Sequence, residues 1–231
     1  LVSPTPAGKD RFGFAVDVED DTVVVGAYGD STRASYAGAA FVYQRGPEGW
    51  RLEKRLEAPE ADADANHQFG GEVAIDSGRI AVGANNDADA GRQAGAVYVF
   101  EDEGGWVLRT KLLPDPGDGA RMGFYSLAME RNTILAGSVN TNRVYAWRRD
   151  SAGTWRPEAF ETPAGHRYFG WRVAIRHGLV GISSRHRGVY FYRAGPQGWS
   201  LLEELADNGN SGKSFGWKVG MGGGTVAVAV L

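Results

Sequence analysis

The chain has 231 residues, of which 42% are hydrophobic and 11% aromatic; this is enough for a folded core and excludes an intrinsically disordered chain. Its formal net charge of −3 offers no bulk basic field for nucleic acid, and the lack of cysteine excludes disulfides, thiolate metal sites and cysteine nucleophiles. No stretch approaches the roughly 18 apolar residues of a membrane-spanning helix, so we expect neither nucleic-acid binding nor membrane insertion.

A Phe-Gly pair recurs along the chain at intervals of 46 to 57 residues. Twelve residues further on, each pair is followed by two small residues, as in Gly26-Ala27 and Gly83-Ala84. Regular self-similarity with this period is typical of propeller blades. The pairs stand at 12–13, 69–70, 169–170 and 215–216, and Met122-Gly123 fills the remaining place.

Each repeat predicts four short strands, A to D. In the second repeat, strand A is 73–75, strand B is the β-branched 80–82, strand C is the aromatic 97–100, and strand D begins at Trp106. Short turns rich in Asp, Asn and Gly join A to B, as hairpins require. No segment has the pattern of an amphipathic helix.

Small sheets of this kind bury their faces by packing side by side around an axis, so we predict an all-β single domain, residues 1–231, that forms a β-propeller of about five four-stranded blades. A β-sandwich is the alternative. Residues 1–11 resemble the end of a strand D, so the last blade is either shared by the two termini or incomplete; an incomplete blade would leave a strand edge open to a partner. The predicted repeat units are about 12–68, 69–121, 122–168, 169–214, and 215–231 together with 1–11.

These motifs resemble the FG-GAP repeats of the integrin α-chain propeller and its bacterial relatives. The resemblance is nearly complete from Phe69 to Trp106 and weaker in the later repeats. It implies an extracellular, cell-surface or periplasmic protein that acts in adhesion or ligand binding. The calcium loop that such repeats often carry between strands A and B is replaced here by a tight turn, so that calcium site is not expected.

The B–C and D–A loops emerge on one face, which we call the loop face, and long polar loops on a rigid scaffold are where binding sites tend to be built. Acidic residues predominate there in the first two repeats and basic residues in the rest, a charge asymmetry that would steer a charged partner. Aromatic residues at the starts of strands A add faces on which a ligand can stack. The predicted ligand-binding residues are Asp30, Arg33, Tyr36, Asp87, Arg92, Arg121, Arg167, Tyr168, Trp171 and Trp217.

Alternating acidic side chains suggest calcium as the one cofactor to consider, because hard cations prefer several oxygen ligands. A full calcium loop is not matched, since His67 and Val73 occupy the positions for the glycine and the bidentate acid. The residues of this metal hypothesis are Asp62, Asp64, Asn66, Asp87 and Asp89.

We expect a non-enzymatic module that recognises a protein or glycan through the loop face. A strict lectin and an assembly subunit that pairs through the incomplete blade are alternatives. A hydrolase is the last alternative, because carboxylates are plentiful but no catalytic motif such as GxSxG or HExxH accompanies them.

Overall fold

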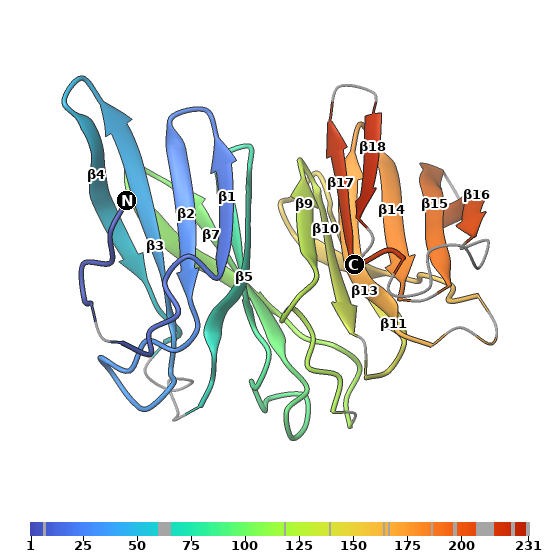
Figure 1. Ribbon diagram of the computed structural model, residues 1–231, viewed down its shortest axis with the longest axis horizontal. Coiled ribbons are helices and arrows are strands. Elements are labelled where there is room, and N and C mark those ends of the chain that lie inside the picture. The colour runs from blue at the N-terminus through green and yellow to red at the C-terminus, as the bar shows by residue number, and fades with distance from the viewer. Residues whose placement is uncertain are drawn as a thin grey trace. The chain divides into compact units, whose positions relative to one another are not determined.

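The computed structural model describes residues 1–6, 8–59, 66–117, 119–138, 140–163, 165, 167–185, 187–195, 198–206, 215–222 and 225–229. Within these residues the regular structure is entirely β-strand, as Figure 1 shows. The same residues contain no helix that could span a membrane. The chain divides into two compact units, Leu1–Phe124 and Tyr125–Leu231, which are described separately.

The first unit contains two four-stranded antiparallel sheets, each with its strands in chain order. The first sheet is β1 (Ala15–Glu19), β2 (Thr22–Ala27), β3 (Ala39–Gly46) and β4 (Gly49–Leu56). The second sheet is β5 (Phe69–Asp76), β6 (Arg79–Ala84), β7 (Ala96–Asp102) and β8 (Trp106–Leu112).

The second unit repeats this arrangement. The third sheet is β9 (Leu127–Glu130), β10 (Thr133–Ser138), β11 (Arg143–Arg149) and β12 (Trp155–Glu158). The fourth sheet is β13 (Phe169–Arg176), β14 (Leu179–Ser184), β15 (Gly188–Gly195) and β16 (Gly198–Ala206), and the fifth is β17 (Lys218–Gly222) paired with β18 (Thr225–Ala229). The predicted all-β class and four-strand repeat are therefore confirmed for the first four sheets.

The amino-terminal segment differs from the prediction. The described residues among 1–11 form no strand; instead, the Tyr43 hydroxyl of β3 donates a hydrogen bond of 2.8 Å to the Val2 carbonyl. The expected strand D at this end is thus wrong, because the segment is held as a loop against the first sheet. The fifth sheet has two strands within the described residues.

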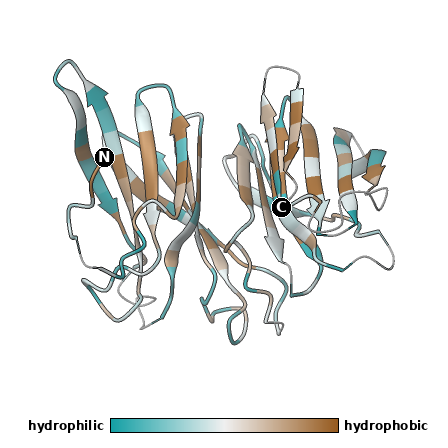
Figure 2. Ribbon diagram, viewed as in Figure 1, coloured by the Kyte–Doolittle hydropathy of each residue, from teal (hydrophilic) through white to brown (hydrophobic). Residues whose placement is uncertain are grey.

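Neighbouring sheets within a unit pack face to face. The core between the first and second sheets includes Val24 and Val42 from one and Val73, Ile75 and Tyr98 from the other. The second strands supply much of this core, whereas the fourth strands are mostly polar. Figure 2 shows the difference between the hydrophobic β2 and the largely hydrophilic β4.

The Phe-Gly pair forms the joint between one sheet and the preceding one. The phenyl ring of Phe69 is fully buried, and Gly70 has a φ of +85°, which only glycine adopts without strain. The Gly70 carbonyl lies so close to Gly26 of β2 that a Cβ there would collide with it. The glycine of the small pair is therefore required by the backbone of the next repeat. The same contact joins Gly83 to Gly123 and Gly137 to Gly170.

An acidic side chain at the end of the first strand completes each of two joints. The Glu19 carboxylate accepts hydrogen bonds from the N–H groups of Ser77 and Gly78, in the A–B turn of the second sheet. Glu130 accepts the same two bonds from His177 and Gly178 in the fourth sheet. These bonds satisfy turn donors and fix the register of one sheet against the next.

We predict that Gly83→Ala lowers the free energy of unfolding by roughly 1–3 kcal/mol, because its methyl group would force the second sheet away from Gly123. Urea unfolding followed by tryptophan fluorescence measures the change. Gly46→Ala is the matched control, since Gly46 has an ordinary φ and its nearest neighbour is 3.9 Å from a Cβ. An equal loss in both variants would contradict the proposed joint.

Candidate functional site

The Asp30 carboxylate is buried and paired internally, although it follows β2 in a loop. Arg55 of β4 donates two hydrogen bonds to it, from Nη1 at 3.0 Å and from Nη2 at 2.8 Å. Burial by itself would raise the pKa of Asp30, but the bonds from Arg55 and from the Thr32 backbone outweigh it and hold the pKa below its usual value. Asp30 therefore holds the loop in place and stands outside the candidate site.

Asp87 occupies the same position in the second repeat and is equally enclosed. Its Oδ2 atom lies 2.6 Å from Lys111 Nζ and 2.9 Å from His67 Nε2, and it accepts a bond of 2.8 Å from the Tyr98 hydroxyl. Desolvation raises the pKa of Asp87, but the bonds from His67, Lys111, the Asp89 backbone and Tyr98 outweigh it and lower the pKa. Asp87 is likewise a structural residue.

The fourth repeat exchanges the signs of this pair. Arg187 takes the place of the acid, with the same turn bond from its N–H to the last residue of the second strand. Glu204 takes the place of the base and accepts a bond of 2.8 Å from the Tyr190 hydroxyl. Burial and the adjacent Glu204 raise the pKa of Tyr190. The loop after the second strand and the fourth strand therefore carry opposite charges in this repeat too, but with the base in the loop and the acid on the strand.

The metal hypothesis is not strengthened by the placement of its described residues. The Asp87 carboxylate already contacts His67, Lys111 and Tyr98. A carboxylate oxygen of Asp89 lies 2.6 Å from Lys111 Nζ. The Asn66 side-chain oxygen accepts a bond from Gln68. Asp62 and Asp64 lie outside the described residues, and the described part of the chain contains no group of three His, Asp or Glu side chains able to hold a metal.

Three of the predicted aromatic residues come together in the second unit, in what we call the aromatic–arginine cluster. Trp171 lies at the start of β13, with its ring centroid 5.3 Å from that of Trp217, which directly precedes β17. Tyr168 packs edge-on against Trp171 at 6.5 Å, and 44% of its surface is exposed. Tyr125 stacks on Trp171 at 5.8 Å. The cluster is completed by Arg172 and Arg185.

The two arginines lie over the aromatic faces. The Arg185 guanidinium carbon is 4.9 Å from the Trp171 ring centroid and 4.8 Å from that of Trp217, so two indoles hold one cation. Arg172 lies 5.3 Å from Tyr125 and 5.5 Å from Trp171. Among the described residues Arg185 has no acidic partner, and its buried Nε lacks a hydrogen-bond acceptor. A fixed guanidinium of this kind is suited to a carboxylate.

Sequence reasoning identified only part of this cluster. The Phe-Gly motif located Trp171 and Trp217, whereas Arg172 and Arg185 are not among the predicted ligand-binding residues. Arg185 directly follows β14, and this position lies beside the start of strand A of the next repeat. The sequence could therefore have predicted that Arg185 belongs to the site. Tyr28, the matching residue of the first repeat, packs against Phe14 and Phe124 with centroids 4.6 and 5.7 Å away.

Of the other predicted ligand-binding residues, all but Arg167 lie in the first unit. Arg33 donates a hydrogen bond to the Ala58 carbonyl, and Arg121 donates one to the Gln93 side chain, so both hold loops of the first unit together. The Tyr36 carbonyl accepts a bond from the Gln68 N–H. Arg92 is exposed in the first unit, and Arg167 is exposed next to Tyr168.

Comparison with known families supports the repeat motif. Residues 1–43 and 50–100 match the model of the FG-GAP repeat, which confirms the resemblance over these residues. No curated protein matches the chain.

Several solved structures share its fold. A protein of unknown function from Desulfotomaculum acetoxidans is similar over 98% of this chain and 64% of its own, with a TM-score of 0.65 and 11% identity. The computationally designed Ika8 protein matches with a TM-score of 0.57 and 14% identity, over 94% of this chain and 54% of its own. A candidate 6-phosphogluconolactonase from Bacteroides uniformis matches at 0.60 and 11%, over 90% of this chain and 61% of its own. Such identities show the fold alone, and the chain spans less than two thirds of each of these proteins.

We predict that Asp30→Asn lowers the free energy of unfolding at neutral pH by roughly 1–3 kcal/mol, because it removes the buried charge that accepts two hydrogen bonds from Arg55 and leaves Arg55 with Glu57 as its one carboxylate partner among the described residues. The folded-state pKa of Asp30 is depressed, so its contribution is present above the unfolded-state pKa near 4 and is lost as the pH falls through the lower, folded-state value. Urea unfolding between pH 7 and pH 3 therefore shows a smaller acid-induced loss in the variant than in the wild type. Asp20→Asn, an exposed acid in the A–B turn, is the control; a similar profile for both variants would contradict the assignment.

Proposed function

The chain carries FG-GAP repeats over residues 1–43 and 50–100, and from this premise we propose that it is part of a β-propeller that serves as a non-enzymatic recognition module. The four-stranded sheets, joined in each unit by the same Phe-Gly contact, support their assignment as blades. Binding is a common task of such scaffolds, and it depends on the site and not on the fold. The site that supports it best is the aromatic–arginine cluster.

The ligand that fits this cluster is an acidic protein segment. Arg185 lies between two indole rings without an acidic partner among the described residues, so a carboxylate from outside would complete it. The two indoles hold the guanidinium in place before the ligand binds, so less conformational entropy is lost on binding. Tryptophan, tyrosine and arginine are also the residue types that dominate the energetics of protein interfaces. The observation that carries the proposal is Arg185, which is stacked between two indoles and has no acidic partner within the part of the chain that the structure describes.

We propose no catalytic step for this face. Asp30 and Asp87, the buried carboxylates of its loops, are engaged in ion pairs, and this leaves neither of them available as an acid or base. We propose that the module acts outside the cytoplasm, in line with its resemblance to FG-GAP repeat proteins. Antibody staining of intact source cells tests this location, and a signal confined to the cytosol would contradict it.

We predict that panning a random peptide library on the immobilised chain enriches peptides rich in Asp and Glu, and that added salt weakens their binding. Arg185→Gln should reduce affinity for a selected peptide about tenfold or more, since it removes a charge-assisted hydrogen-bond donor. The matched control is Arg176→Gln, the same change at the opposite end of β13, which should leave affinity unaltered. Titration calorimetry measures both.

The outcomes separate the alternatives. Enrichment without acidic bias, or equal losses in the two variants, would contradict the assignment. A neutral-glycan array probed in parallel would favour a lectin if it gave a signal that Arg185→Gln left unchanged.

A further inference from the structure

The fourth and fifth sheets border a small cavity beside the A–B turn of the fourth sheet. Its volume is about 160 Å³, which is room for several water molecules or one small oxyanion. All of its lining residues belong to the second unit, in which β17 packs against β13 and β14, as Figure 1 shows. The lining includes Arg176, His177, Leu179 and Arg193 from the fourth sheet and Met221 and Val226 from the fifth.

The strand register places two arginines on the same face of the fourth sheet. Arg176 of β13 is paired with Leu179 of β14, and Leu179 is paired with Arg193 of β15. Because cross-strand partners point to the same face, the two arginines flank Leu179 with their Cα atoms roughly 10 Å apart. Gly181 lies on this face two residues beyond Leu179, and a Cβ on it would meet Met221 of β17. Both arginines therefore extend toward the fifth sheet.

The fourth sheet carries a base at a position where two other sheets carry an acid. Glu19 and Glu130, the last residues of β1 and β9, accept hydrogen bonds from N–H groups in the A–B turn of the next sheet. Arg176 is the last residue of β13 and has the same register position. The joint between the fourth and fifth sheets therefore has a cation in place of this carboxylate.

The positive charge at the cavity has no acidic partner among the described residues. The lining contains no acid, and Arg176 and Arg193 form no ion pair within the described part of the chain. The carboxylate of Glu130 already accepts hydrogen bonds from the N–H groups of His177 and Gly178. Two arginines that extend toward one cavity repel each other, and an anion placed between them would be attracted by both.

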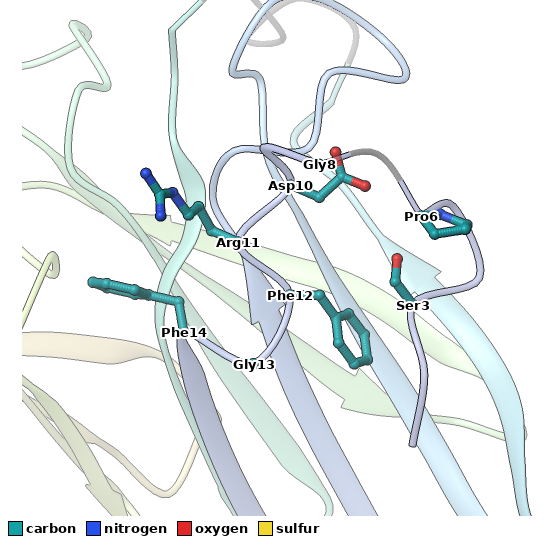
Figure 3. Close-up of a pocket in the computed structure, with 8 residues that line it drawn as sticks. All are labelled: Ser3, Pro6, Gly8, Asp10, Arg11, Phe12, Gly13 and Phe14. Carbon is teal, nitrogen blue, oxygen red and sulfur yellow. The ribbon is translucent and has the colours of Figure 1, made fainter.

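A hollow in the first unit has a different charge pattern. Its volume is about 490 Å³, and Figure 3 shows that both Asp10 and Arg11 belong to its lining. An acid and a base in one lining largely cancel, so this hollow gives no reason to expect a charged ligand. The cavity of the second unit differs because its ionisable lining residues are all bases.

We propose that the cavity between the fourth and fifth sheets binds a phosphate group through Arg176 and Arg193. A guanidinium is a planar fork of N–H donors that matches phosphate oxygens, and two of them offset its roughly two negative charges. A carboxylate has one charge and two oxygens, so it matches two arginines less well. His177 adds a ring nitrogen as a further donor. The apolar Leu179 and Met221 exclude water from part of the cavity, which strengthens the attraction between opposite charges.

The phosphate site is separate from the aromatic–arginine cluster. Arg176 ends β13, whereas Trp171 lies near the start of the same strand. The phosphate proposal therefore does not rest on the proposed recognition site, and either proposal can fail without the other. Arg176→Gln distinguishes them, because it should weaken phosphate binding and leave the affinity for the selected acidic peptide unchanged.

We predict that calorimetric titration of the chain with inorganic phosphate shows one site per molecule, and that added sodium chloride weakens the binding. Arg193→Gln and Arg176→Gln should each lower the affinity about tenfold, because each removes charge-assisted hydrogen bonds to the phosphate. Arg156→Gln is the matched control, since Arg156 lies on β12 of the third sheet and pairs with Asp150; it should leave the affinity unchanged. All three arginines are exposed, so we expect the variants to fold as the wild type does.

Titrations with phenyl phosphate and with acetate complete the test. Tighter binding of phenyl phosphate than of inorganic phosphate would mean that the cavity takes the phosphate group of a larger molecule, and the reverse order that it takes the free ion. Acetate should bind at least tenfold more weakly than phosphate. Equal affinity for acetate and phosphate, no saturable phosphate binding, or equal losses in the three variants would overturn the proposal. A loss of phosphate binding in Arg185→Gln but not in Arg193→Gln would also overturn it, because the phosphate would then lie in the aromatic–arginine cluster.

Discussion

The contact between two glycines of neighbouring sheets is the constraint on which the rest of the structure depends. The Gly70 carbonyl presses against Gly26, and this closeness brings Val73 and Ile75 into the core of the first sheet. A side chain at either glycine would separate the sheets and open that core. The two most regular motifs of the sequence, Phe-Gly and Gly-Ala, are thus the two halves of one backbone contact.

The joint also explains where variation is allowed. Because backbone atoms hold the sheets together, the loops beside the joint can change their side chains from repeat to repeat. The first two repeats place a buried acid there, Asp30 or Asp87, paired with a base on the fourth strand. The fourth repeat reverses the signs with Arg187 and Glu204 and has a much shorter B–C loop. This shortened loop carries Arg185 beside the indole of Trp171.

Reasoning from the sequence located the aromatic half of the candidate site and missed the basic half. Trp171 and Trp217 follow a motif whose structural role is fixed, so their neighbourhood could be inferred. Asp30 and Asp87 were predicted to bind a ligand, because nothing local in the sequence indicates that a base two strands away, at Arg55 or Lys111, pairs with each of them. Whether a charged loop side chain forms an ion pair or is solvated depends on which residue of the fourth strand lies next to it in the folded sheet.

The sequence by itself determined the all-β class, the repeat, its four strands and the glycines of the joints, since these follow from local periodicity and from the geometry that only glycine permits. Tertiary structure alone decided which charges are buried in pairs, that Arg185 lies between two indoles, and that Arg176 lines a cavity whereas Glu19, at the same position of its repeat, accepts hydrogen bonds from a turn. Identical motifs have different surroundings when their neighbours differ, and burial, pairing and exposure are properties of those surroundings.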